Sequence, residues 1–231
     1  MEIKRMFVTG DTHGERARFT YFFNRLFRAG DVLFICGDFG YIFDDNESER
    51  AFLDEIAQQK YTVCFVDGNH ENFPAIFASP EMIWNGGRVH KIRNNIFHLM
   101  RGEIYQINRK RILVFGGAYS IDKAFRTEGR SWWPQEMPTE EEYENARKNI
   151  EEAGNKVDYI LTHAAPEETM CMFHPHHSEE MKLNIFLEWI RENVDYMHWY
   201  MGHLHRDEDV WRNQSVLWFD IKDMETNESI F

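Results

Sequence analysis

Five short apolar runs in this chain are each followed directly by a block that carries hard or borderline metal ligands. The runs have the length and composition of buried strands. The blocks are Gly10-Asp11-Thr12-His13-Gly14, Gly37-Asp38-Phe39-Gly40, Gly68-Asn69-His70-Glu71-Asn72, Thr162-His163 and Gly202-His203-Leu204-His205. Open α/β sheets place their sites at the carboxyl ends of strands, where these blocks would fall. Because no core-packing requirement explains five such strand ends, we expect their side chains to form one site.

The order of the elements predicts an α/β fold. Strands are expected at 3–9, 32–36 and 62–66, with helices at 15–27 and 47–59 between them. This alternation implies right-handed connections and a largely parallel sheet. Between 88 and 115, four short apolar runs separated by turn residues predict hairpins that add a second sheet.

The second half of the chain is predicted to mix loops, helices and strands. Residues 121–138 show no periodicity and are predicted to form a long loop, of the kind often used as a lid or binding loop. Thr139 and Glu142 have the spacing of a capping box at the start of a helix. The remaining predicted elements are that helix at 139–153, strands at 157–161 and 195–201, a loop at 167–178, a helix at 179–193 and a closing hairpin at 210–219. Since no linker or repeat interrupts 1–231, we expect one domain.

Composition restricts the partners and the location. The 231 residues carry a net charge of −13, which repels nucleic acid and anionic membranes at long range. Long duplex DNA is therefore an unfavoured partner, although a local basic patch could bind a short nucleic acid. The apolar runs are too short to span a bilayer. Three cysteines without a paired framework, and no signal peptide before the first strand, predict the cytoplasm. The residues define no oligomeric state.

The strand-end ligands form a mixed nitrogen and oxygen donor set. They are Asp11, His13, Asp38, Asn69, His163, His203 and His205. Such a set suits Mn, Fe or Zn rather than Ca or Mg. Seven side chains are too many for one ion and suit two divalent ions roughly 3.5–4 Å apart, bridged by a carboxylate and a water. The Asp-x-His and His-x-His spacings favour convergence, because alternate residues of an extended stretch point the same way.

The order of these blocks resembles the calcineurin-like metallophosphoesterase superfamily, from Asp11 to His205. The resemblance implies a four-layer αββα sandwich of two mixed sheets flanked by helices. It implies that the first metal is held by Asp11, His13 and His205, the second by Asn69, His163 and His203, with Asp38 as the bridge. It implies that His70 donates a proton to the leaving oxygen, with its ring set by Asp11 or Glu71.

The chain departs from the protein Ser/Thr phosphatase branch of this superfamily. That branch carries an Asp-Arg-Gly after the second block and an arginine directly before the third. Here the second block continues with Gly40-Tyr41, and Asp67 precedes Gly68. Without these phosphate-clamping arginines, the chain looks more like small bacterial phosphoesterases of unassigned substrate, and a small-molecule phosphoester is the expected substrate.

Several residues outside the blocks are candidates for other roles. Arg16, Lys123 and Arg126 are candidate substrate contacts, although Lys123, Arg126 and Arg130 could equally be solvated charges. Trp132-Trp133 either anchors the long loop or stacks on a substrate, and anchoring is preferred. His90, His98 and His198 are predicted to be structural residues of strands. His174, His176 and His177 match no motif.

The predicted function is metal-dependent hydrolysis of a phosphate mono- or diester. A water that bridges two cations has a lowered pKa, so hydroxide is present near neutral pH. An imidazole opposite this nucleophile can protonate the departing alkoxide, which assigns His70 as general acid beside Asp38 and Glu71. Two alternatives remain: a metal-binding scaffold for protein interaction, and a nuclease acting on short nucleic acids.

Overall fold

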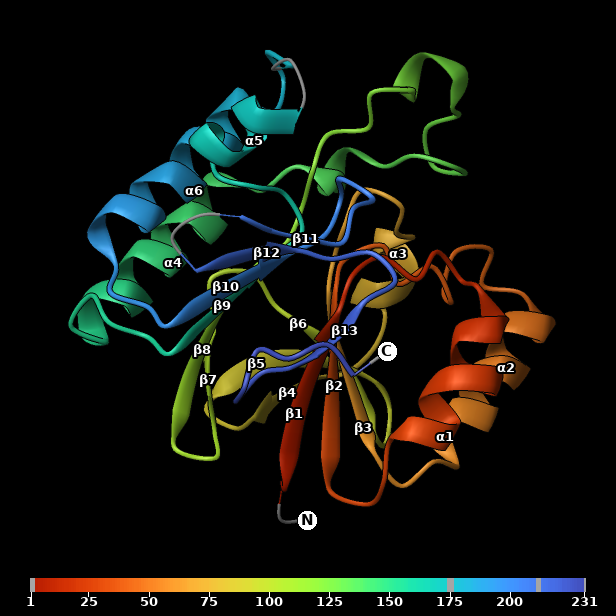
Figure 1. The fold of residues 1–231 in the computed structure, drawn as a ribbon. Helices are drawn as coiled ribbons and strands as arrows, with labels where there is room; N and C mark the ends of the chain where they lie inside the picture. Colours follow the sequence, from red (N-terminus) through yellow and green to blue (C-terminus); the bar gives the residue numbers. More distant parts are fainter. Residues whose placement is uncertain (1–2, 174–176, 211–212, 231) are drawn as a thin grey trace.

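Two β-sheets face each other and are covered by helices on their outer sides (Figure 1). The computed structural model describes residues 3–173, 177–210 and 213–230. The first sheet has seven strands in the order β13-β1-β2-β3-β6-β5-β4, and the second has six in the order β11-β12-β10-β9-β8-β7. This is the predicted four-layer α/β sandwich of two mixed sheets, and the fold class is confirmed.

Four neighbouring strands at the centre of the first sheet run parallel to one another. They are β1 (Arg5–Thr9), β2 (Asp31–Cys36), β3 (Thr62–Val66) and β6 (Ile96–Leu99). Antiparallel strands close both edges: β13 (Ile221–Asp223) on one side, and β5 (Gly87–Arg93) with β4 (Glu81–Trp84) on the other.

The second sheet repeats this plan. Its parallel centre comprises β8 (Lys110–Phe115), β9 (Tyr159–Thr162), β10 (His198–Met201) and β12 (Gln214–Val216). Its antiparallel edges are β7 (Ile104–Ile107) and β11 (Glu208–Val210). Each sheet therefore directs the carboxyl ends of four parallel strands to one side.

Three apolar cores separate the four layers. One lies between the sheets, one lies between the first sheet and its helices, and one lies between the second sheet and its helices. Neighbouring residues of β1 point to different cores: Val8 to the inner one and Phe7 to the outer one. This alternation is the period of two that a strand imposes on its side chains.

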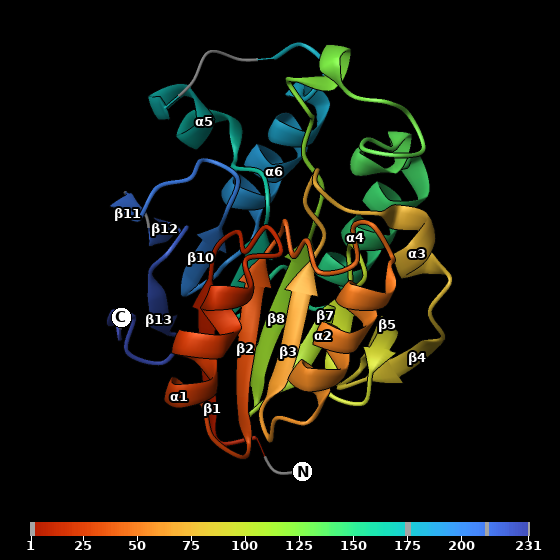
Figure 2. The ribbon, with the colours of Figure 1, turned by 90° about the vertical axis from the view of Figure 1, so that its right-hand side faces the viewer.

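Helices cover the outer face of each sheet (Figure 2). The first sheet is covered by a π-helical turn at Arg18–Phe23 that continues into α1 (Asn24–Leu26), by α2 (Glu47–Ala57) and by α3 (Phe73–Phe77). The second is covered by α4 (Glu140–Glu152), α5 (Glu167–Phe173) and α6 (Met181–Asn193). The capping box predicted for α4 is confirmed, because Thr139 and Glu142 each accept a backbone N–H of the other. Within the described residues, no helix is long and apolar enough to cross a membrane.

Three predictions of local structure are corrected. The hairpins between 88 and 115 are divided, since β5 and β6 extend the first sheet and only β7 and β8 build the second. The predicted loop at 167–178 is helical over Glu167–Phe173, where Thr169 and Met170 are buried. The chain also ends in one more strand than predicted, because β13 returns to pair with β1.

The strands that precede the five polar blocks end at the same edge of the sandwich. They are β1, β2, β3, β9 and β10, and the upward arrows of β2 and β3 in Figure 2 point to this edge. Above that edge stand α5 and the predicted loop at 121–138, whose only helical turns are Lys123–Phe125 and Pro134–Glu136. The site is therefore built where both sheets end and beneath two protruding segments.

Candidate metal centre

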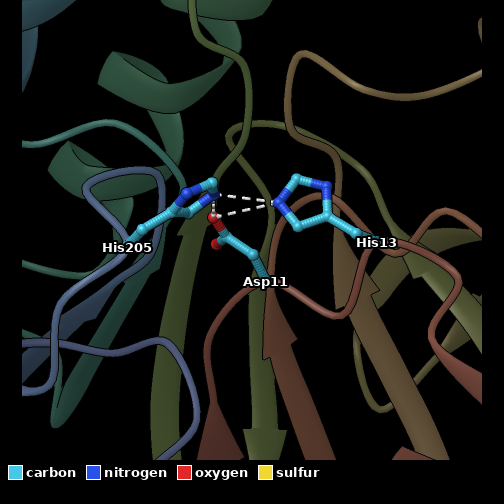
Figure 3. A group of neighbouring side chains, drawn as sticks. All are labelled: Asp11, His13 and His205. Carbon is cyan, nitrogen blue, oxygen red and sulfur yellow. Dashed lines mark hydrogen bonds and ion pairs between the residues drawn. The ribbon is translucent and has the colours of Figure 1, made fainter. Parts of the chain in front are cut away.

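Asp11, His13 and His205 converge from the ends of β1 and β10 (Figure 3). The Nε2 atoms of His13 and His205 face each other at 2.9 Å. The Nε2 of His205 also lies 3.0 Å from Asp11 Oδ2, and that of His13 lies 3.8 Å from the same oxygen. Three potential donor atoms thus meet around one point, as the resemblance implied for the first metal.

A second group of donors adjoins the first and shares Asp11 with it. Asp11, Asp38 and His163 bring one ligand atom each within 4.8 Å of one another. The Nε2 of His163 lies 3.1 Å from Asn69 Oδ1 and 3.5 Å from Asp38 Oδ2. His163 donates its Nδ1–H to the carbonyl of Cys36 at 2.8 Å, since a carbonyl can only accept. This hydrogen bond leaves the Nε2 lone pair directed at Asn69 and Asp38.

Asp38 lies between the two groups. Its Oδ2 is 3.5 Å from His163 Nε2 and 3.8 Å from His13 Nε2. Burial alone would raise the pKa of this carboxyl, but His163, His70 and His13 lower it to about 2. Asp38 is therefore ionised at neutral pH, and its carboxylate faces both groups of donors.

The donor set fits divalent transition-metal ions. Asp11 and Asp38 are both 1% exposed, and the groups that face them are imidazoles rather than lysine or arginine side chains. The two carboxylates favour the protonated form of the imidazoles beside them. Hydrogen bonding to Asp11 raises the pKa of His205. Burial opposes protonation of His163, but the charges of Asp38 and Asp11 raise its pKa. Buried carboxylates among imidazole nitrogens are the ligand chemistry of Mn, Fe and Zn sites.

Four of the predicted ligands have backbones in the left-handed region. The φ angles are 46° at His13, 47° at Asp38, 66° at His203 and 50° at His205. Such angles are uncommon for residues with a side chain, and they cluster at functional sites. The expectation that an extended His-x-His stretch points both rings the same way is wrong. His205 turns to Asp11, whereas the ring of His203 packs beside that of His163 at a centroid distance of 4.9 Å.

Glycines in the blocks allow ligands to lie against the backbone. Gly37 has a φ of 94°, and a Cβ there would overlap the ring of His163. A Cβ on Gly68 would overlap Asp38 Oδ1 and come within 2.5 Å of the Asp38 nitrogen. Gly37 and Gly68 thus leave space for a predicted ligand that another strand end carries.

His70 lies at the rim of the metal centre, but its ring is not held by a carboxylate. Among the described residues, the ring forms its hydrogen bond with Arg126, whose Nη2 is 3.0 Å from both ring nitrogens. Glu71 instead accepts the backbone N–H of Phe39 at 2.7 Å, so it supports the strand end that carries Asp38. The expectation that Asp11 or Glu71 sets the ring is not met. Burial lowers the pKa of His70, and Arg126 adds to this effect against the opposing charge of Asp38.

The three candidate substrate contacts lie in different places. Arg126 reaches the site, where it pairs with Asp122 and contacts His70. Lys123 lies over the ring of Trp132, with its Nζ 3.6 Å from the ring centre. Arg16 turns away and donates to the backbone carbonyl of Ser48 at 2.9 Å. Of the three, only Arg126 contacts a residue of the metal centre in this structure.

A cavity of about 340 Å³ opens onto the metal centre. Besides predicted metal ligands and His70, the cavity is lined by Tyr119, Ile121, Asp122, Met170, His177, Glu180 and Leu204. His177 therefore lines the cavity, whereas His174 and His176 lie outside the described residues. Trp132 and Trp133 are buried, which agrees with their predicted anchoring of the loop.

Sequence reasoning missed the groups that support the ligands from behind. Asp67, one residue before Gly68, accepts from Arg101 Nε at 2.9 Å and lies 3.1 Å from His98 Nε2. Asn69 donates to the hydroxyl of Ser120 at 3.2 Å, which turns its Oδ1 toward the site. The structural role predicted for His98 is confirmed. No sequence signal marked Arg101 or Ser120, since each lies in a different segment from its partner.

A two-sheet α/β sandwich with carboxylate and imidazole donors at its carboxyl edge is the arrangement of a metal-dependent phosphoesterase. The chain belongs to the calcineurin-like phosphoesterase family, whose model matches residues 4–207.

A solved structure of similar fold is described as a putative 5'-nucleotidase from Staphylococcus aureus in complex with alpha-ketoglutarate. It is 14% identical, with a TM-score of 0.53, and the alignment covers 97% of this chain and 52% of that one. This chain thus spans about half the length of that protein. Among curated proteins, none matches this chain.

Proposed function

We propose that this protein hydrolyses a phosphate mono- or diester of a small molecule, using two metal ions, a water nucleophile and His70 as general acid. The observation that carries the proposal is the pair of adjoining donor groups that share Asp11, with the ionised Asp38 between them. A single ion would leave one of these groups of carboxylates and imidazoles uncompensated.

The protein's residues fall into two sets around such ions. Asp11, His13 and His205 would hold the first, Asn69, His163 and His203 would hold the second, and Asp38 would touch both. Bound there, the ions would polarise the phosphoryl oxygens and lower the pKa of a water molecule enough to supply hydroxide. Mn is the ion we would supply first, with Fe and Zn as the alternatives for this donor set.

His70 and Arg126 form the substrate side of the site. The ring of His70 packs edge-on against that of His13, with centroids 5.3 Å apart, so it borders the first group of donors. A protonated His70 there can donate to the departing oxygen. Arg126 places a guanidinium beside it, where it can bind a non-bridging phosphoryl oxygen. Arg126 would then leave His70 for the substrate.

The cavity supports a small substrate. Its volume of about 340 Å³ lies in the range of small-molecule pockets, and Ile121, Met170 and Leu204 give it apolar walls next to the ligands. The net charge of −13 disfavours a long nucleic acid. We also propose that residues 1–231 form one domain that acts in the cytoplasm. Nucleotides are substrates to test first, because the protein of similar fold is described as a putative 5'-nucleotidase.

The test compares bis-p-nitrophenyl phosphate with p-nitrophenyl phosphate, on metal-free protein refilled with Mn. A faster diester rate directs the search to cyclic nucleotides, nucleotide diesters and short oligonucleotides. A faster monoester rate directs it to nucleotides, sugar phosphates and phosphopeptides. Full turnover by His70→Ala or Asp38→Ala at normal metal content would refute the assigned roles. No metal-dependent rate on any of these substrates would favour the scaffold alternative.

A further inference from the structure

Glu180 is a buried carboxylate in the wall of the metal-centre cavity that no sequence motif marks. It precedes the first residue of α6, is 1% exposed, and lines the cavity together with His203. Its Oε1 accepts from Asn184 Nδ2 at 3.2 Å. Its Oε2 is buried and has no hydrogen-bond partner among the described residues. That oxygen lies 3.8 Å from His203 Nε2.

An unpartnered carboxylate oxygen is unfavourable inside a protein. Removing it from water without a compensating hydrogen bond costs free energy, and more so when the group is charged. Glu180 does not serve as an N-terminal cap either, because its side chain accepts no backbone N–H of α6. Glu180 Oε2 therefore needs a hydrogen-bond donor on the cavity side, and the group that faces it there is His203 Nε2.

His203 in turn needs an acceptor for one of its ring nitrogens. A metal-ligating imidazole binds through one nitrogen and donates the N–H of the other to a carbonyl, a carboxylate or water. His163 already follows this rule, since its Nδ1–H donates to the carbonyl of Cys36 while Nε2 faces the donors. For His203 the corresponding acceptor would be Glu180, on the Nε2 side.

We propose that Glu180 is a positioning residue that accepts the Nε2–H of His203 and thereby presents Nδ1 of His203 to the second metal ion. The inference rests on the proposed function, because it requires that second ion. At 3.8 Å the two atoms lie just beyond hydrogen-bond distance. A small movement closes the gap when the ion binds, and this movement couples the start of α6 to occupancy of the second site.

Two substitutions separate positioning from simple packing. In Glu180→Gln, the amide oxygen stays toward Asn184, because Asn184 Nδ2 is held as a donor by the carbonyl of Ala165 as well. The amide NH₂ then faces His203 and donates to Nε2, which favours the tautomer with its hydrogen on Nδ1. A protonated Nδ1 cannot bind the metal ion. In Glu180→Ala, water can accept the Nε2–H, but the contact with Asn184 is lost. Positioning therefore predicts that Gln impairs metal binding more than Ala, while Ala destabilises the fold more than Gln.

The experiment is a calorimetric titration of the metal-free, full-length protein with MnCl₂, alongside thermal unfolding of the same samples. Glu179→Gln is the matched control, since Glu179 is the exposed neighbour of Glu180. We expect the wild type and the control to bind two equivalents. We expect Glu180→Gln to weaken one equivalent by about 10–100-fold, the usual effect of losing an outer hydrogen-bond partner of a metal ligand, and to leave the other unchanged.

The outcomes distinguish the inference from the function on which it rests. If the wild type binds two Mn equivalents and both Glu180 variants bind them equally well, the positioning role is overturned and the proposed function stands. Weaker binding by Glu180→Ala than by Glu180→Gln, in step with the losses of thermal stability, also overturns it in favour of packing. A wild type that binds fewer than two equivalents overturns both.

Discussion

Replacing Arg101 by methionine tests whether the buried pair with Asp67 supports the strand end that carries the metal centre. Asp67 is 1% exposed and Arg101 is 5% exposed. Arg101 also donates to the backbone carbonyl of Gln135, at the end of the 121–138 loop, and to Glu142 of α4. Methionine keeps much of the volume and the apolar stem of arginine but removes every one of these donors. Asp67 is then left buried with His98 as its remaining side-chain partner.

The expected loss of stability is large because the remaining charge stays buried. Removing one partner of a buried ion pair costs about 3–5 kcal/mol. For a chain of this size, each kcal/mol lowers the melting temperature by about 2–4 °C, so a fall of roughly 6–20 °C is expected. The loss should be measured by urea and thermal unfolding. The control is Arg50→Met: the side chains of Arg50 and its partner Asp45 are both about half-exposed, and an exposed pair is worth about 0–1 kcal/mol.

The pH dependence of stability gives an independent check. Burial alone would raise the pKa of Asp67, but Arg101 and His98 hold it well below its usual range. In the wild type this carboxyl therefore stabilises the fold above the unfolded pKa of about 4, and the contribution is lost as the pH falls through the folded value. Without Arg101, burial is opposed only by His98, and the pKa of Asp67 rises. Protonation then relieves the buried charge, so the deficit of Arg101→Met should shrink between pH 7 and pH 4.

Two results would refute this reasoning. One is a loss no greater than that of Arg50→Met, which would mean that Asp67 finds another partner or water. The other is a deficit that grows on acidification, which has the wrong sign for an uncompensated carboxylate. The double variant Asp67→Asn with Arg101→Met should recover part of the loss, because it removes the orphaned charge.

Three further outcomes follow from the site. Arg126→Ala should raise KM roughly 10-fold or more with unchanged Mn content, because a charge-assisted contact to the phosphoryl group is lost. The control is Arg130→Ala, on the exposed part of the loop, which should match the wild type. Equal kinetics of the two variants would contradict this role of Arg126. Gly68→Ala should displace Asp38, because the new Cβ would overlap its Oδ1, and should lower Mn binding in a direct titration. Unchanged binding would show that the strand end shifts to accommodate the new Cβ. Adding Mn to metal-free protein should raise the melting temperature with Mn concentration, as for any ligand of the folded state alone, and an unchanged melting temperature would argue against a metal site.

The sequence by itself determined the strand ends and the chemistry they carry. An apolar run and the polar block after it are contiguous, so Asp11, Asp38, Asn69 and His163 could each be assigned to the end of a strand from local pattern alone. Parallel strands of one sheet end at the same edge, which brings Asp11, Asp38 and Asn69 together, whereas His163 reaches them from the second sheet. The cap of α4 was likewise readable, because Thr139 and Glu142 contact each other within one helical turn.

Only the tertiary structure decided which segments meet. β6 (IFHL) and β7 (IYQI) are both short, largely apolar strands, and their assignment to different sheets depends on which strand each one pairs with. The contacts of Arg126 with His70, Arg101 with Asp67 and Glu180 with His203 join residues between 23 and 56 positions apart. Contacts of this kind have no local signal, because they arise from the packing of whole elements rather than from the conformational preferences of neighbouring residues. The candidate metal ligands could therefore be predicted from the sequence, whereas the groups that hold and orient them could be identified only in the folded chain.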